Sequence, residues 1–369
     1  MDELHGVNTM ERTMMARAAA RRMPVSGSME LLPLCNMNCD MCYVRLSRAE
    51  MEAQGRLRSA EEWLTLGAQM ARMGVLFLLL TGGEPLLHPG FKEIYLGLRK
   101  LGMILTVNTN AALIDEQWAD FFAQHKPRRV NITLYGTGND EYERLCHYPG
   151  GFDRVIRAIR LLRARQVDVR MGFSVTPANE SSLKGFLALA KELDCAIISD
   201  AYMSPSSRER SRPFEQQNRL LPEAAAQASM TIKCFDADEK QIAESARKMV
   251  AKIDAYVPGE KQPCESSCMA GRCSFTVNWQ GLLRPCVLAS EPEANAFDLG
   301  FERAWKQVSG AFLKRRYCAD CSVCPVRELC RVCPVACKAE TGDYLGRPEY
   351  LCRYAKETER LLRELAENC

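Results

Sequence analysis

The sequence has few histidines and no long apolar run, and each absence excludes a class of protein. Only four histidines occur among 369 residues, and none lies at a ligand spacing from another, which argues against a histidine-based metal site. The longest apolar run, residues 75–80, is far shorter than the ~18 residues that a membrane-spanning helix needs. The first 22 residues mix acids and bases without an apolar centre, so they are not a secretory signal. We therefore expect a cytoplasmic protein that does not enter a membrane.

An excess of one charge is also missing. The sequence has 49 basic and 46 acidic residues, which gives a net charge of only +3, and the charges are scattered. Because nucleic-acid binders usually carry a basic stripe, we expect no nucleic-acid partner. The sequence has no P-loop, no nucleophile elbow and no Rossmann fingerprint after a strand-like run, which excludes the corresponding nucleotide-binding and hydrolase classes. With 47% hydrophobic and 26% charged residues, the chain is expected to fold as a globular protein.

Cysteine, in contrast, is abundant and unevenly distributed. Residues 1–250 contain six cysteines and residues 251–369 contain twelve. Because thiols stay reduced in the cytoplasm, this density indicates metal binding, with iron–sulfur clusters or zinc as the soft-metal candidates. The sequence therefore predicts an N-terminal domain with one tight cysteine trio, followed by a C-terminal domain that is held together by metal.

The N-terminal part alternates strand-like and helix-like segments. Such alternation is typical of a parallel sheet with right-handed crossovers. Six units are too few for a complete eight-stranded barrel, so we predict an α/β fold with an open, partial (β/α)6 barrel over residues 28–203. The predicted strands are 29–34, 75–81, 103–109, 129–135, 167–175 and 196–202, and the predicted helices are 60–73, 90–101, 115–124, 152–165 and 180–193.

Chemistry in barrels lies at the carboxyl ends of the strands, and two motifs are found at such positions. After the first predicted strand, Cys35, Cys39 and Cys42 occupy one tight loop, where three thiolates can hold a cubane cluster while one iron stays open. A zinc site with a distant fourth ligand, or reduced structural thiols, is the alternative interpretation. After the second strand comes Gly-Gly-Glu-Pro at residues 82–85. Its glycines let the backbone approach a ligand closely, although an ordinary glycine turn would look the same.

Together these two motifs resemble the radical S-adenosylmethionine (SAM) superfamily, over roughly residues 28–203. The resemblance implies a [4Fe–4S] cluster on Cys35, Cys39 and Cys42, whose open iron is chelated by the amino and carboxylate groups of SAM. Reductive cleavage of SAM then gives methionine and a 5′-deoxyadenosyl radical, which abstracts hydrogen from a substrate. The resemblance also implies SAM contacts from residues at strand ends, namely Tyr43, Gly82, Gly83, Glu84, Pro85, Asn108, Asn110 and Ser174. Ala111 stands where the family often has a glycine.

The C-terminal cysteines resemble a SPASM domain, the cysteine-rich extension of radical enzymes that modify peptides and proteins. This second resemblance implies a small domain with two auxiliary [4Fe–4S] clusters. It assigns Cys321, Cys324, Cys330 and Cys352 to an outer cluster, and Cys268 and Cys286 to an inner cluster. The spacing departs from the family after Cys330, so the other inner ligands stay open among Cys264, Cys273, Cys333 and Cys337, and Cys318 is spare. A pair of zinc knuckles is the alternative.

The remaining segments complete the predicted organisation. It comprises an N-terminal extension over 1–27, a helical insert over 204–263, the SPASM domain over 264–353 and a C-terminal helix over 354–369. The insert, with helices near 222–231 and 237–254, is either a solvated linker or a wall of the substrate site, where Arg208, Arg210 and Arg212 would meet an acidic peptide. The residues before the first strand are too few for the winged-helix leader-binding domain of many relatives. Either a separate leader-peptide-recognition protein supplies this function, or the barrel and the insert over 204–263 bind the peptide directly. An external electron donor, flavodoxin or ferredoxin, is a further expected partner.

The leading functional prediction is a radical enzyme that cross-links a ribosomally synthesised precursor peptide or modifies it at another C–H bond. An anaerobic sulfatase-maturing enzyme, which forms formylglycine, shares the architecture, but Val-Leu-Ala-Ser follows Cys286 and the expected carboxylate is missing. A peptide epimerase with Cys146 as hydrogen donor is a further alternative, although Cys146 is more simply an ordinary side chain. An iron–sulfur or zinc scaffold is the non-enzyme alternative, and a scaffold has no reason to carry both motifs. The sequence identifies no catalytic base.

Overall fold

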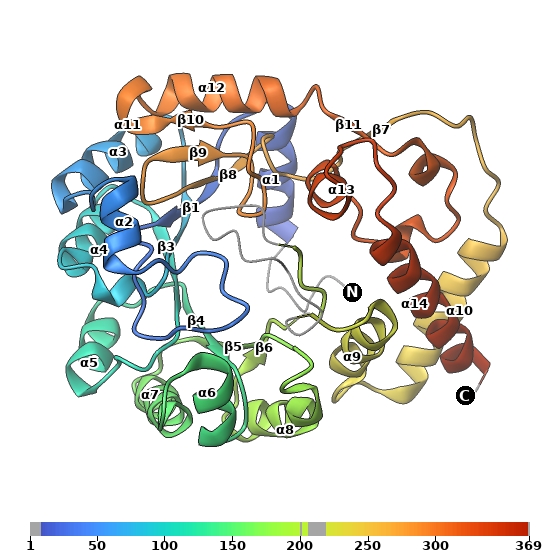
Figure 1. The fold of residues 1–369 in the computed structure, drawn as a ribbon, viewed down its shortest axis with the longest axis horizontal. Coiled ribbons are helices and arrows are strands. Elements are labelled where there is room, and N and C mark those ends of the chain that lie inside the picture. The colour runs from blue at the N-terminus through green and yellow to red at the C-terminus, as the bar shows by residue number, and fades with distance from the viewer. Residues whose placement is uncertain (1–8, 200, 206–218, 368–369) are drawn as a thin grey trace.

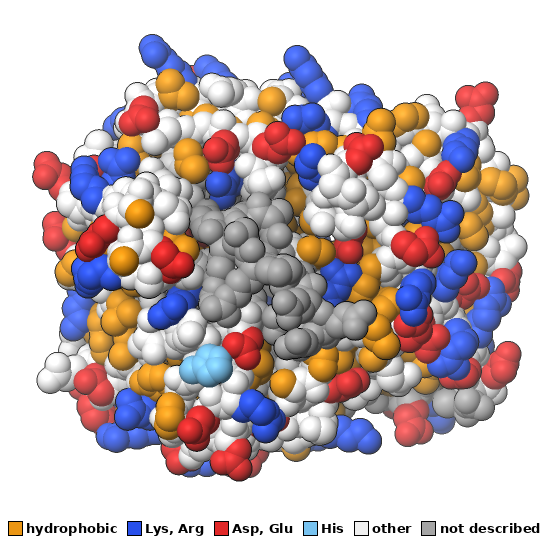
Figure 2. All heavy atoms as spheres, in the orientation of Figure 1, with side chains coloured by type: hydrophobic (Ala, Val, Ile, Leu, Met, Phe, Trp, Pro, Cys, Tyr) orange, Lys and Arg blue, Asp and Glu red, His pale blue; other side chains and the backbone are white. Residues whose placement is uncertain are grey.

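The computed structural model describes residues 9–199, 201–205 and 219–367. Figure 1 shows a parallel sheet with helices around its outer side, and a smaller helical and cysteine-rich part beside it. Within the described ranges, no helix is long and apolar enough to cross a membrane. On the face drawn in Figure 2, basic and acidic side chains of described residues are intermixed, so this face carries no basic stripe.

Six parallel strands form the centre of the sheet, as the alternating sequence pattern predicts. They are β1 Ser26–Glu30, β2 Phe77–Thr81, β3 Ile104–Thr109, β4 Arg129–Leu134, β5 Val169–Phe173 and β6 Ala196–Ile197, and they lie side by side in chain order. The first strand differs from the predicted range of 29–34. Its pairing with β2 ends where the Leu31 N–H donates to the Thr81 carbonyl, 2.9 Å away. Pro33 has no N–H for a further ladder bond, so residues 31–34 leave the sheet.

Helices cover the outer face of the sheet, five of them at the predicted places and two, over 48–54 and 139–146, that the sequence pattern did not predict (Figure 1). They are α2 Arg48–Gln54, α3 Ala60–Arg72, α4 Phe91–Lys100, α5 Glu116–Gln124, α6 Asn139–Cys146, α7 Gly151–Ala164 and α8 Leu183–Glu192. The helix α3 begins at a capping box, in which the Ser59 hydroxyl accepts from the Glu62 N–H and the Glu62 carboxylate accepts from the Ser59 N–H. The helix α4 buries positions 91, 94, 95 and 98, the spacing of one helix face.

Three strands from the C-terminal part extend the same sheet, which the sequence pattern did not predict. They are β8 Ser274–Val277, parallel to β1, and β9 Leu282–Arg284 and β10 Ala294–Asn295, which continue the sheet in antiparallel pairs. The Phe275 ring packs over Gly27, where an added Cβ would lie 2.3 Å from the ring. Only glycine allows this close approach, so β1 and β8 are matched in shape as well as in hydrogen bonds.

The rest of the C-terminal part consists of helices, irregular segments and one short pair of strands. It contains β7 Cys264–Glu265 paired with β11 Arg316–Tyr317, and the helices α11 Ala296–Leu299, α12 Phe301–Phe312, α13 Pro334–Thr341 and α14 Glu349–Glu367. The predicted helices of the insert are present as α9 Pro222–Cys234 and α10 Glu239–Asp254, and both pack against α14 (Figure 1). The insert arginines Arg208, Arg210 and Arg212 lie outside the described residues.

A buried ion pair joins the insert to the C-terminal part. The Arg219 guanidinium donates to both carboxylate oxygens of Glu340, at 3.0 Å each, and the two side chains are 12% and 8% exposed. The Tyr202 hydroxyl donates to the same carboxylate at 3.1 Å, and the Arg219 guanidinium lies 3.4 Å from the centroid of the Tyr350 ring. Glu340 therefore connects the end of the barrel, the insert and α13. Removing the Glu340 carboxylate would leave the Arg219 guanidinium buried without an anionic partner.

We predict that Glu340→Ala lowers the free energy of unfolding by about 3–5 kcal/mol, because one member of a buried ion pair is removed. The matched control is Glu244→Ala, which removes an exposed pair with Lys248 on α10 and should cost less than about 0.5 kcal/mol. Urea unfolding of the reconstituted protein under anaerobic conditions measures both values. An equal loss of unfolding free energy in the two variants would contradict the conclusion that Glu340 connects the barrel, the insert and α13.

Candidate active site

The loop that carries the cysteine trio follows β1, and the end of α6 holds it in place. The Asn38 N–H donates to the Cys146 carbonyl at 2.9 Å, and the Asp40 N–H donates to the Leu145 carbonyl at 3.1 Å. The His147 Nε2 lies 2.8 Å from the Asp40 carboxylate. Because three contacts come from consecutive residues of one helix end, the middle of the cysteine loop has a fixed position relative to the sheet.

The three thiols of the loop have polar partners that suit a sulfur ligand. The Cys35 Sγ accepts from the Met37 N–H at 3.4 Å and from the Asn110 side-chain amide at 3.5 Å. The Cys42 Sγ accepts from the Arg45 N–H at 3.3 Å. Such N–H donors stabilise thiolates over thiols, whereas burial acts in the opposite direction and raises the pKa of the Cys35 thiol to about 12.

The third member of the trio, Cys39, has buried side-chain partners that the sequence did not reveal. The Cys39 Sγ lies in hydrogen-bond contact with the Cys146 thiol and the Tyr135 hydroxyl. The hydrogen bond to Cys146, together with burial, raises the pKa of Cys39 well above its ordinary value. Cys146 itself is fully buried at the end of α6. Its closeness to Cys39 joins residues 107 positions apart in the sequence, and no sequence spacing signals it.

The glycine motif lies directly beside the cysteine loop. The Gly83 N–H donates to the Leu32 carbonyl at 2.7 Å, and the Glu84 N–H donates to the Leu34 carbonyl at 2.9 Å. A Cβ on Gly82 would lie 2.5 Å from the Leu32 oxygen, and a Cβ on Gly83 would lie 2.3 Å from the Leu34 oxygen. Both positions therefore need glycine, because any side chain would separate the two loops.

Glu84 connects the ends of β2 and β3 through its buried carboxylate. The carboxylate accepts from the Thr109 hydroxyl at 2.8 and 2.9 Å, from the Asn110 N–H at 2.8 Å and from the Leu86 N–H at 3.1 Å. Burial raises the pKa of Glu84 to about 7, and the backbone donors oppose that rise. The side chain of Glu84 thus faces the protein interior, where it orders the loop, and its neighbour Pro85 begins a short 3-10 turn at Pro85–Leu87.

The other predicted SAM-contacting residues differ in their surroundings. The Asn110 side chain donates to the Asn36 side-chain oxygen at 2.8 Å, which places it against the cysteine loop. The Asn108 side chain accepts from Asn131 on the neighbouring strand, at 2.8 Å. Ser174 is half-buried just after β5, and Tyr43 is half-buried in the cysteine loop. Asn110 and Tyr43 are therefore associated with the trio, whereas Asn108 is paired within the sheet.

The donor set of this loop fits an iron–sulfur cluster better than a single metal ion. Among the described residues, no three His, Cys, Asp or Glu side chains converge closely enough to bind one ion. Three thiols that share one loop but do not meet at a point suit a cubane, because each thiolate binds a different iron. Beside them, the Asn36 Nδ2 and the Arg45 Nε are buried donors without a protein acceptor. Such donors fit a polar cofactor at this position.

The C-terminal cysteines fall into three groups, with Cys369 outside the described residues. An inner group contains Cys268, Cys286 and Cys333, which act on one another electrostatically. An outer group contains Cys324, Cys330 and Cys352. A Tyr317 group contains Cys264, Cys318, Cys321 and Cys337, which pack with Tyr317 in one buried cluster. Cys273 packs beside α1 (Thr9–Ala20) with Ala18, Ala19 and Val25, and Cys268 of the inner group acts on it electrostatically.

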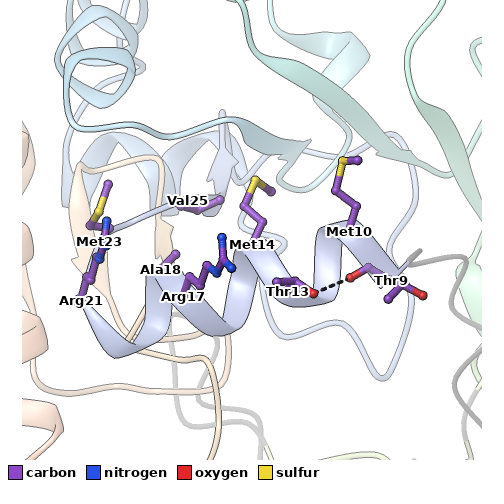
Figure 3. Close-up of a pocket in the computed structure, with 9 residues that line it drawn as sticks. All are labelled: Thr9, Met10, Thr13, Met14, Arg17, Ala18, Arg21, Met23 and Val25. Carbon is purple, nitrogen blue, oxygen red and sulfur yellow. Dashed lines mark hydrogen bonds between the residues drawn. The ribbon is translucent and has the colours of Figure 1, made fainter.

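One open groove lies away from the trio. It has a volume of about 660 Å³ and is an open groove along α1, bounded by Met23 and Val25 before the start of β1 (Figure 3). The cysteine loop follows the opposite, carboxyl end of β1. The groove therefore does not contain the residues with candidate chemistry.

Comparisons with known proteins agree with this geometry. Residues 29–189 match the family model of the Radical SAM superfamily. The chain is 23% identical to the AdoMet-dependent heme synthase of Methanosarcina barkeri over 337 residues, which are 88% of this chain and 95% of that protein. It is 25% identical to the PqqA peptide cyclase of Xanthomonas oryzae pv. oryzae over 322 residues, or 83% of this chain and 81% of that protein.

A solved structure extends the similarity of fold to almost the whole chain. The structure of Streptococcus suis SuiB bound to S-adenosylmethionine is similar with a TM-score of 0.68, at 16% identity, over 92% of this chain and 81% of that one. The shared region includes both the parallel sheet and the cysteine-rich part, since it covers nearly all residues. The family implies a [4Fe–4S] cluster and SAM as cofactors. Residues 29–189 are therefore a radical SAM domain, and the chain is a radical SAM enzyme in which a cysteine-rich region follows this domain.

Proposed function

We propose that this enzyme abstracts hydrogen from a ribosomally synthesised precursor peptide and forms a cross-link or another C–H modification. The proposal rests on the contact between the cysteine loop and the glycine motif, in which the N–H groups of Gly83 and Glu84 donate hydrogen bonds to the backbone of residues 32–34. The similarity to a peptide cyclase over 83% of the chain supports a peptide as the substrate class. The fold shared with SuiB, a protein also solved with its precursor peptide, supports the same class.

In this proposal, Cys35, Cys39 and Cys42 hold the cluster, and the backbone at Gly82 and Gly83 approaches SAM. When bound, these cofactors supply the 5′-deoxyadenosyl radical. The chain's own residues position them: the Met37 and Arg45 N–H groups stabilise sulfur ligands, and Asn110 fixes Asn36 against Cys35. The SAM contacts proposed from the resemblance are Tyr43, Gly82, Gly83, Glu84, Pro85, Asn108, Asn110 and Ser174, with the contribution of Glu84 made through the loop that it orders.

Two auxiliary clusters belong to the proposal. The inner one uses Cys268, Cys286 and Cys333, and the outer one uses Cys324, Cys330 and Cys352, to which the SPASM pattern adds Cys321. Cys273 is a further candidate ligand of the inner cluster, because Cys268 acts on it electrostatically, although its side chain also packs beside α1. These clusters would bind the substrate or accept the electron left after ring closure, and flavodoxin or ferredoxin would supply the electron that cleaves SAM. A separate leader-peptide-recognition protein is a proposed partner.

Three other activities are compared with the peptide cross-link. Heme formation is the second candidate, because the similarity to the heme synthase covers 95% of that protein. Formylglycine formation is disfavoured, since residues 287–290 contain no carboxylate to act as the base after Cys286. Epimerisation with Cys146 as hydrogen donor is disfavoured as well. The Cys146 side chain is fully buried against Cys39 and leaves no surface for a peptide Cα to approach.

The trio is tested by replacing all three of its cysteines with alanine. The triple variant Cys35→Ala/Cys39→Ala/Cys42→Ala should lose about four irons per chain and form no 5′-deoxyadenosine with SAM and dithionite. The matched control is Cys195→Ala, a buried cysteine of the same domain, whose thiol donates only to the Leu193 carbonyl. The control should keep both the iron and the activity. Formation of 5′-deoxyadenosine by the triple variant would contradict the assignment of the radical site.

The substrate class is tested by mass spectrometry of a candidate peptide encoded next to the enzyme's gene. After incubation with enzyme, SAM and reductant, a loss of two hydrogens per event is expected for a cross-link. An unchanged mass with deuterium uptake from solvent would indicate an epimerase instead. Conversion of a Cys-x-Pro-x-Arg peptide to formylglycine, or heme formation from a porphyrin precursor, would replace the proposal with the corresponding alternative.

A further inference from the structure

The Tyr317 group contains more buried thiols than the SPASM pattern uses. Its four cysteines, Cys264, Cys318, Cys321 and Cys337, are each less than 9% exposed and pack in one cluster. The pattern assigns only Cys321 to a cluster, leaves Cys264 and Cys337 undecided and makes Cys318 spare. The inner and outer groups each have three thiols of their own without any of these four. The group therefore needs an explanation beyond the two auxiliary clusters.

The four thiols come from three separate elements that converge on Tyr317. The pairing of β7 with β11 places Cys264 opposite Tyr317, and Cys318 follows Tyr317 directly and precedes the 3-10 turn Ala319–Val323. Cys337 lies on α13, which packs against β11. Converging cysteines from a strand, a CxxC turn and a helix are typical of a metal centre, since apolar packing alone does not require sulfur at every position.

The contacts inside the group are those of sulfur ligands. The Cys318 and Cys321 thiols are hydrogen-bonded to each other within the Cys-Ala-Asp-Cys turn. The Cys337 Sγ accepts from the backbone N–H of Cys318, a donor that stabilises a bound thiolate. These thiols belong to one compact set, because all of them pack in the same cluster.

The positively charged side chain of Arg327 lies next to the Tyr317 group. The Arg327 guanidinium donates to the Tyr317 hydroxyl at 2.6 Å and acts electrostatically on Cys264 and Cys321. Buried thiolates are costly without such compensation, and a cluster with four thiolate ligands carries net negative charge. Arg327 thus supplies charge of the sign that a cluster bound by thiolates requires.

We propose that Cys264, Cys318, Cys321 and Cys337 bind a third C-terminal [4Fe–4S] cluster, separate from the inner and outer clusters. This assignment takes Cys321 from the outer cluster, to which the SPASM pattern adds it. The outer cluster keeps Cys324 and Cys330, which pack against Ile253, Val326 and Ala355 in a different cluster of buried residues, and Cys352, which acts electrostatically on Cys330. A single zinc ion is the less suitable occupant, because among the described residues no three ligands converge at the spacing of one ion. The site rests on these residues alone and does not depend on the identity of the peptide substrate.

The count of irons is measured in a chain that lacks the radical cluster. In the Cys35→Ala/Cys39→Ala/Cys42→Ala background, anaerobic reconstitution should give about twelve irons and as many acid-labile sulfides, from three clusters. About eight irons, with or without one zinc, would overturn the proposal. Because this background makes no radical, the result is independent of whether the enzyme modifies a peptide, a porphyrin or another substrate.

Adding Cys318→Ala and Cys337→Ala to that background should remove about four further irons and one reduced-cluster signal from the electron paramagnetic resonance spectrum. The matched control is Cys195→Ala, which changes a buried cysteine of the barrel outside all groups and should leave the count unchanged. If the double substitution prevents folding, the near-isosteric Cys318→Ser serves instead and should shift the spectrum of one cluster only. An unchanged spectrum and iron count in Cys318→Ser would contradict a cluster at this position.

Discussion

The contact between two loops, one after β1 and one after β2, is the constraint on which the rest of the site depends. The N–H groups of Gly83 and Glu84 donate hydrogen bonds to the backbone of residues 32–34. Because Gly82 and Gly83 have no side chain, no atom separates the two loops. The buried Glu84 carboxylate then holds the end of β3 through Thr109 and Asn110. Asn110 in turn contacts Cys35 and Asn36. One carboxylate and two glycines therefore set the position of the cysteine loop relative to three strands.

This arrangement explains why a carboxylate with a pKa of about 7 is retained in the interior. An apolar residue of similar size would leave the Asn110 and Leu86 N–H groups without their acceptor, and buried unpaired amides cost about 1–3 kcal/mol each. The motif Gly-Gly-Glu-Pro is thus a structural requirement as well as a proposed cofactor contact. Its glycines admit the neighbouring backbone, and its glutamate fixes the next strand.

Much of the barrel could be predicted from the sequence, because it depends on local patterns. The six strands and the helices between them are visible as apolar runs and helical periodicity, and the trio and the glycine motif are contiguous in sequence. The first strand was displaced by about three residues, because its apolar run continues into the loop beyond Glu30. The strands β8 to β10 were missed, since they are two to four residues long and β8 pairs with a strand about 250 residues away.

Contacts between distant residues account for what the sequence could not indicate. No spacing rule brings Cys146 to Cys39 or Arg219 to Glu340, because each contact depends on how complete elements pack. The same holds for the cysteines, whose spacing left Cys264, Cys333 and Cys337 equivalent. The fold separates them, because β7 places Cys264 beside Tyr317, whereas Cys333 lies with Cys286.

The parallel pairing of β8 with β1 gives the cysteine-rich part a defined position next to the radical SAM domain. Since β1 also leads into the cysteine loop, one strand connects both parts of the enzyme. The central claim is that the loops after β1 and β2 form one site for a cluster and SAM. Electron paramagnetic resonance of the reduced, reconstituted protein tests it most directly. Addition of SAM should change the signal of one cluster and leave the others unaltered, whereas a spectrum that SAM does not change would contradict the account.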